Sequence, residues 1–70
     1  MKKNLIAALQ SKLLGEQAVA LAEIDLMLDN PRVIPEHTNF MVELESKFAT
    51  LAEITDKLEA IDLYSNYPHG

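Results

Sequence analysis

The residues best suited to ligand recognition lie close together near the middle of the chain. Arg32 is the only arginine, and Glu36 and His37 follow it within five residues. A guanidinium can pair with an anionic partner, and a histidine side chain can donate or accept a hydrogen bond. The same side chains can instead satisfy free carbonyl groups and complement the dipoles at helix ends. Arg32, Glu36 and His37 therefore form a candidate binding corner, with helix capping as the alternative interpretation.

No other group of residues indicates a reaction. The sequence has no cysteine, and its serines lack a glycine-bracketed nucleophile elbow. Gly15 and Gly70 are the only glycines, so no glycine-rich phosphate loop is present. Neither histidine has the glutamate three residues before it that a ferritin-like metal site needs. The sequence predicts a protein that is not an enzyme, with no catalytic residue, no cofactor and no metal.

Two long helices are expected to carry these residues. Apolar residues recur at helical spacing from Leu5 to Leu28, and Pro31 ends the pattern because proline cannot continue a helix. Pro35 suits the first position of a second helix. We predict one domain over residues 1–70, with a helix at about 4–29, a turn at 30–34, a helix at about 35–63 and a flexible tail at 64–70. A short turn requires the helices to lie antiparallel, so the predicted fold class is all-α, an antiparallel two-helix hairpin.

Each helix carries an apolar stripe that is expected to face the other, and we call this contact the seam. On the first helix the stripe contains Ile6, Leu9, Leu13, Gln17, Ala20, Ile24 and Met27. On the second helix it contains His37, Met41, Leu44, Phe48, Leu51, Thr55, Leu58 and Ile61. Folding at the turn places the small Ala20 opposite the bulky Phe48, as interdigitated packing requires. Gln17 and Thr55 fall in the middle, where polar groups weaken packing but penalise a slipped register.

The first helix has more apolar surface than one partner helix can cover. Two further rows at heptad spacing lie on it, Leu14-Leu21-Leu28 and Leu5-Val19-Leu26. A helix that is apolar nearly all round is normally buried. We therefore expect a homo-oligomer, with a dimer of hairpins forming a four-helix bundle favoured over higher oligomers. The predicted oligomer surface consists of Leu14, Val19, Leu21, Leu26 and Leu28.

Smaller features bear on the stability of the helices. Gly15 costs about 1 kcal/mol relative to alanine in a helix interior. It indicates a kink or the end of an N-terminal arm at residues 3–14, with close approach of a neighbouring backbone as the alternative. On the second helix, the Glu43–Lys47 and Glu53–Lys57 pairs have the favourable i,i+4 orientation.

The charge balance restricts the partners. Six Lys and Arg against eleven Asp and Glu give a net charge of −5, although the first fourteen residues hold three lysines and no acid. This balance argues against nucleic acid, whose binding depends on Lys and Arg. The N-terminal apolar run is too short for a signal peptide, and no apolar run approaches the roughly 20 residues that span a bilayer. With no cysteine, the chain is expected in a cytoplasm and away from membranes.

Two stretches carry a resemblance to a known group of proteins. They are Asn30-Pro31, Ile34 and Glu36-His37, followed by Leu51-Ala52-Glu53 and Asp56-Lys57-Leu58-Glu59. Over residues 30–59 the chain resembles short uncharacterised proteins encoded by large contractile-tailed bacteriophages, including those of marine cyanobacteria. In that group glycines flank the isoleucine, where this chain has Val33 and Pro35. The resemblance implies a phage accessory protein in the host cell cytoplasm and implies no activity.

Taken together, the sequence predicts a small acidic helical interaction protein that binds a host or phage macromolecule, with a protein as the expected partner. One alternative is a counter-defence sponge that sequesters an anionic nucleotide signal at an oligomer interface near Arg32 and His37. The scarcity of basic residues argues against that alternative. Another alternative is a minor virion component whose apolar first helix docks on a capsid or tail protein.

Overall fold

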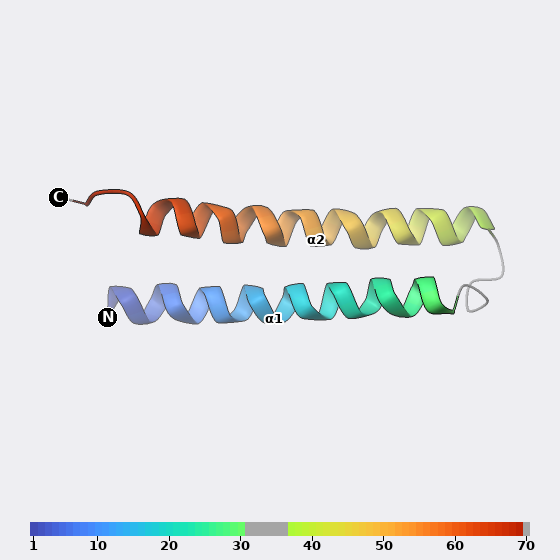
Figure 1. Ribbon diagram of the computed structural model, residues 1–70, viewed down its shortest axis with the longest axis horizontal. Helices are drawn as coiled ribbons and strands as arrows, with labels where there is room; N and C mark the ends of the chain where they lie inside the picture. Colours follow the sequence, from blue (N-terminus) through green and yellow to red (C-terminus); the bar gives the residue numbers. More distant parts are fainter. Residues whose placement is uncertain (31–36, 70) are drawn as a thin grey trace.

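The computed structural model describes residues 1–30 and 37–69, with side chains for 1–30 and 39–69. It contains helix α1, Lys2–Asp29, and helix α2, His37–Ser65. The two helices lie side by side and antiparallel, with both chain termini at the same end (Figure 1). The molecule is elongated and measures 55 × 16 × 13 Å. The predicted all-α hairpin is confirmed. We call the end near Asp29 and His37 the closed end, and the end near the termini the open end.

Local hydrogen bonds account for the ends of α1. The helix ends at Asp29 as predicted, where the backbone N–H of Asn30 donates to the carbonyl of Leu26 at 3.0 Å. It begins about two residues earlier than predicted, because the N–H of Leu5 donates to the carbonyl of Met1 at 3.1 Å. The helix passes through Gly15 without a break, so the predicted end of an arm at residue 14 is wrong (Figure 1).

The end of α2 lies two residues beyond the predicted one. The backbone N–H and the side-chain Nδ2 of Asn66 both donate to the carbonyl of Asp62, at 3.1 and 3.0 Å, and thus cap the helix after Ser65. The following residues fold back on the helix, because the Nε2 atom of His69 lies 2.7 Å from the carbonyl oxygen of Tyr64 and the two rings are 4.4 Å apart. The predicted helical residues 35–36 and turn residues 31–34 lie outside the described residues.

A small core lies between the helices. Among the described residues, the buried side chains are Leu13, Ala20, Ile24 and Ile54. Leu13, Ala20 and Ile54 form one cluster, and partly buried Leu51, Leu58 and Ile61 pack against it. Halfway along the length of the seam, Gln17 Nε2 donates a hydrogen bond to Thr55 Oγ1 at 3.3 Å, which confirms the predicted position of these two residues.

On α2 the predicted face meets α1 in part. Five of its predicted residues are part-buried, as expected: Leu44, Leu51, Thr55, Leu58 and Ile61. Phe40, Lys47 and Ile54 turn toward α1, whereas Met41 and Phe48 are 50% and 49% exposed. Since consecutive helical residues differ by about 100° in direction, the centre of contact lies between the two neighbouring rows.

One predicted seam contact is therefore wrong. Ala20 packs with Leu13 and Ile54, and Phe48 lies outside that cluster, so the predicted contact between Ala20 and Phe48 is not formed. Leu9 was expected in the seam and is also half-exposed. The side chain of His37, another predicted seam residue, is outside the described part of the structure.

Candidate functional site

The predicted oligomer surface of α1 is exposed in the hairpin. Its side chains are between 48% and 62% accessible: Leu14, Val19, Leu21, Leu26 and Leu28. Leu5, which continues one of the two rows, is exposed as well. Because α2 covers only one face of α1, both heptad rows face solvent, and they differ in their surroundings.

The hydrogen bond between Gln17 and Thr55 marks one side of the seam. Leu14 and Leu21 lie three residues before and four residues after Gln17, so they share its side of α1. Leu28 continues this row by one heptad.

The matching residues of α2 lie on the same side. Phe48 and Met41 stand one and two heptads before Thr55, the partner of Gln17. We call this surface the Gln17 side; it contains Leu14, Leu21, Leu28, Met41 and Phe48, each close to half exposed.

The opposite side of the seam carries ion pairs, and we call it the Glu23 side. Lys47 Nζ of α2 lies 3.3 Å from Glu23 Oε2 of α1. On α1 itself, Lys12 Nζ lies 2.8 Å from Glu16 Oε2. The hydrogen bond from Lys12, and then its positive charge, lower the pKa of the Glu16 carboxyl below its usual value.

Val19 sits among these charged groups. A shallow hollow of 570 Å³ on the Glu23 side is lined by Lys12, Gly15, Glu16, Val19, Ala20, Glu23, Thr50 and Ile54. An added Cβ at Gly15 would meet nothing within 4 Å, so this glycine provides no close contact inside the hairpin. The row of Val19 therefore lies among ion-paired charges, whereas the row of Leu21 carries one carboxylate, Asp25 between Leu21 and Leu28, and none of the ion pairs of the described residues.

Charge is distributed unevenly along the hairpin. In the half toward the closed end, residues 16–29 and 39–54 hold seven carboxylates and one lysine. In the half toward the open end, residues 1–15 and 55–69 hold four lysines and three carboxylates. The protein is thus strongly acidic at one end and close to neutral at the other.

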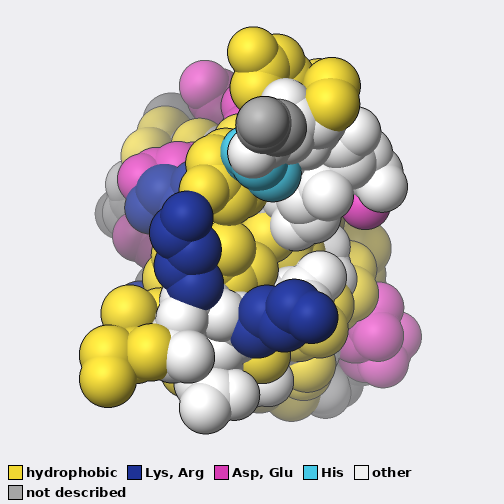
Figure 2. Space-filling view, turned by 90° about the vertical axis from the view of Figure 1, so that its left-hand side faces the viewer, with side chains coloured by type: hydrophobic (Ala, Val, Ile, Leu, Met, Phe, Trp, Pro, Cys, Tyr) yellow, Lys and Arg dark blue, Asp and Glu magenta, His cyan; other side chains and the backbone are white. Residues whose placement is uncertain are grey.

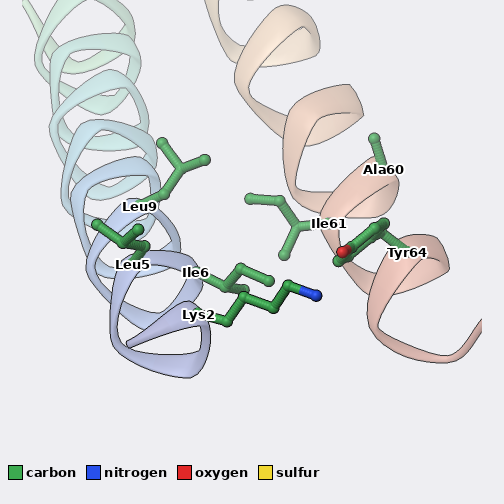
Figure 3. A pocket seen from close by; sticks show the side chains of 7 residues that line it. All are labelled: Lys2, Leu5, Ile6, Leu9, Ala60, Ile61 and Tyr64. Atoms are coloured by element: carbon green, nitrogen blue, oxygen red, sulfur yellow. The ribbon is translucent and has the colours of Figure 1, made fainter. Parts of the chain in front are cut away.

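A hollow that sequence reasoning missed lies at the open end. It measures 410 Å³ and lies between the two helices, with Lys2, Leu5, Ile6, Leu9, Ala60, Ile61 and Tyr64 around it (Figure 3). An adjoining hollow of 490 Å³ shares Lys2 and Tyr64 and is also lined by Lys3 and His69. Lysine and histidine side chains lie beside apolar surface at this end (Figure 2). The hollow joins residues more than fifty positions apart, so no local motif could reveal it.

The candidate binding corner falls outside the described residues. Arg32 and Glu36 belong to the undescribed segment, and the side chain of His37 is undescribed although its backbone begins α2. In the part of the chain that is described, no three His, Asp or Glu side chains are grouped so as to hold a metal ion. Neither described helix contains a stretch long and apolar enough to cross a bilayer.

Comparison with known proteins gives no match to a protein family, to a curated protein or to a solved structure.

Proposed function

We propose that this chain is a non-enzymatic helical interaction protein that self-associates through the uncovered apolar surface of α1. The observation that carries the proposal is that the hairpin exposes a larger solvent-accessible area than a compact protein of equal mass. The hairpin exposes 5665 Å². A compact monomer of 7.8 kDa exposes about 4,400 Å².

The excess surface is large enough to build an interface. It amounts to roughly 1,300 Å², and a standard protein interface takes about 800 Å² from each partner. Large exposed apolar patches on soluble proteins mark interaction sites. The half-exposed leucines of α1 supply such a patch, and the small core between the two helices leaves the hairpin in need of further burial.

The proposal includes a biological setting, which rests on the resemblance over residues 30–59. In this setting the protein is a bacteriophage accessory protein in the host cytoplasm, where the oligomer binds a host or phage protein. The acidic closed end supports a protein partner over nucleic acid, because phosphate groups require Lys and Arg.

Self-association is tested by light scattering coupled to size-exclusion chromatography at micromolar concentration. The unchanged chain is expected at twice the monomer mass, and circular dichroism is expected to show a helical protein in the same sample. A folded monomer of 7.8 kDa would contradict the proposal.

The setting is tested separately by affinity capture from phage-infected cells with mass spectrometry. Wild-type protein and a folded Leu21→Glu variant are compared side by side. A partner captured by the wild type and lost with the variant supports an interaction that depends on the α1 surface. Equal capture by both proteins would place the partner site elsewhere.

A further inference from the structure

We propose that a second copy of the chain packs on the Gln17 side in a head-to-tail arrangement, with the closed end of one hairpin over the open end of the other. This inference rests on the proposed self-association and specifies its surface and its direction. Two independent observations carry it: the contrast between the two sides of the seam, and the uneven distribution of charge along the hairpin.

The Gln17 side is the more favourable of the two apolar surfaces. None of the three ion pairs among the described residues lies on it, and apolar side chains come to it from both helices. Leu14, Leu21 and Phe48 can be buried there without removing a paired charge from water. Burial of the Glu23 side would desolvate the Glu23–Lys47 pair, which is costly unless new partners are supplied.

The charges decide the direction of packing. On the Gln17 side the closed half carries Asp25, between Leu21 and Leu28, and Glu45, between Met41 and Phe48. A head-to-head dimer would bring these carboxylates of the two copies together, so like charges would repel along the interface. A head-to-tail dimer places each acidic half over a half that is close to neutral and that carries Lys3, two heptads before Gln17, on the interface side. Electrostatic complementarity therefore selects the head-to-tail dimer.

The charges of α1 point to the same arrangement. Lys2 and Lys3 lie in its first turn and Asp29 is its last residue, so both ends carry the charge that the helix dipole disfavours. Within one helix this placement is unfavourable. In a head-to-tail dimer the lysines of one α1 lie near Asp25 and Asp29 of the other copy, and each group gains an opposite charge.

The direction is tested by pulsed electron paramagnetic resonance on the intact dimer. Since the chain has no cysteine, Asn4→Cys and Val19→Cys each give one spin label per copy, at exposed positions of α1 off the Gln17 side. In the head-to-tail dimer each residue away from the middle of α1 adds about 3 Å, twice the helical rise, to the axial separation of the two labels. The axial separation of the labels at Asn4 is therefore expected to exceed that at Val19 by roughly 24 Å.

A head-to-head dimer would give similar distances at Asn4 and Val19, which would overturn the proposed direction while leaving self-association intact. A monomer would give no distance between labels and would contradict the proposed function itself. Light scattering on the labelled samples separates these two failures.

The surface is tested with two matched leucines of α1. Leu21→Glu on the Gln17 side is expected to convert the dimer to a monomer at micromolar concentration. Leu26→Glu, off that side and 62% exposed against 48% for Leu21, is expected to remain dimeric. The reverse pattern, or dissociation by both variants with helicity retained, would overturn the assignment of the Gln17 side. Circular dichroism of each variant shows that any loss of dimer is not a loss of fold.

Discussion

The side-chain amide of Gln17 donates a hydrogen bond to the hydroxyl oxygen of Thr55 at 3.3 Å, and this bond joins α1 to α2 in the part-buried middle of the hairpin. Apolar contacts lie on either side of it along the seam, formed by Leu13 and Ala20 of α1 with Ile54 of α2. Apolar contacts of this kind tolerate the sliding of one helix along the other, whereas each member of a polar pair loses its hydrogen-bond partner when the helices slide. The pair thus fixes the register of the two helices more than it adds to their stability.

Replacing one partner of this bond is expected to cost more than replacing both. Thr55→Val leaves the Gln17 amide without its partner and is expected to lower the free energy of unfolding by about 1 kcal/mol. The double variant Gln17→Leu/Thr55→Val is expected to recover that loss, because an apolar pair of similar shape needs no hydrogen bond. Urea unfolding of both single variants and the double variant measures the coupling. Additive losses would show that the bond contributes nothing to the seam.

Gly15→Ala is expected to stabilise the protein by about 1 kcal/mol. The position lies inside a continuous helix, and an added Cβ would meet nothing within 4 Å. Alanine therefore gains helix propensity without a steric cost. Thermal unfolding measures the change, and the exposed Ala18→Gly provides the control, with a loss of similar size expected. A destabilised Gly15→Ala variant would show that another backbone approaches this position in the oligomer.

Ala20→Leu is expected to destabilise the hairpin by about 1–3 kcal/mol. Ala20 is only 3% exposed and packs in the cluster with Leu13 and Ile54, so a larger side chain must displace its neighbours. The control is Ala22→Leu, which adds the same atoms at an exposed position of the same helix. Chemical unfolding compares the two variants. Equal unfolding midpoints would mean that the seam has room at Ala20.

The carboxyl of Glu16 is expected to titrate below its usual pKa, because Lys12 donates a hydrogen bond to it and adds a positive charge. A lowered pKa in the folded state means that the pair stabilises the protein above the usual pKa of glutamate. This contribution is lost as the pH falls through the lowered value. A carbon-detected NMR titration of Glu16 measures it. Lys12→Met should return the pKa toward its usual value, and an unchanged pKa would exclude Lys12 as the cause.

The sequence by itself determined the architecture. Helical periodicity and Pro31 located α1 to its last residue, and the short turn forced the second helix to run antiparallel. Leu13, Ala20 and Ile24 are buried as predicted, because they belong to the apolar stripe of α1 that was expected to face the second helix. The exposure of Leu14 and Leu21 also followed from the sequence, because α1 has more than one apolar face and a single neighbouring helix covers only one face. Local periodicity is sufficient for all of these features.

Only the tertiary structure decided how α2 is rotated about its own axis. The row through Met41 and Phe48 and the neighbouring row through Phe40 and Ile54 both step by heptads, so periodicity alone cannot choose between them. The row through Phe40 also contains Lys47, which counts against burial in a sequence. In the structure its stem lies along the seam while its Nζ reaches Glu23 on α1 instead of Glu43 on α2.

The open-end hollow and the two sides of the seam depend on the same rotation. Lys2 and Ile6 from the N-terminal end of the chain line the same hollow as Tyr64 from the C-terminal end. The separation of the Gln17 side from the Glu23 side depends on which α2 residues meet each flank of α1. Such relationships are set by the packing of whole helices against each other, because the apolar contact energy depends on the summed fit of many side chains and not on any one residue.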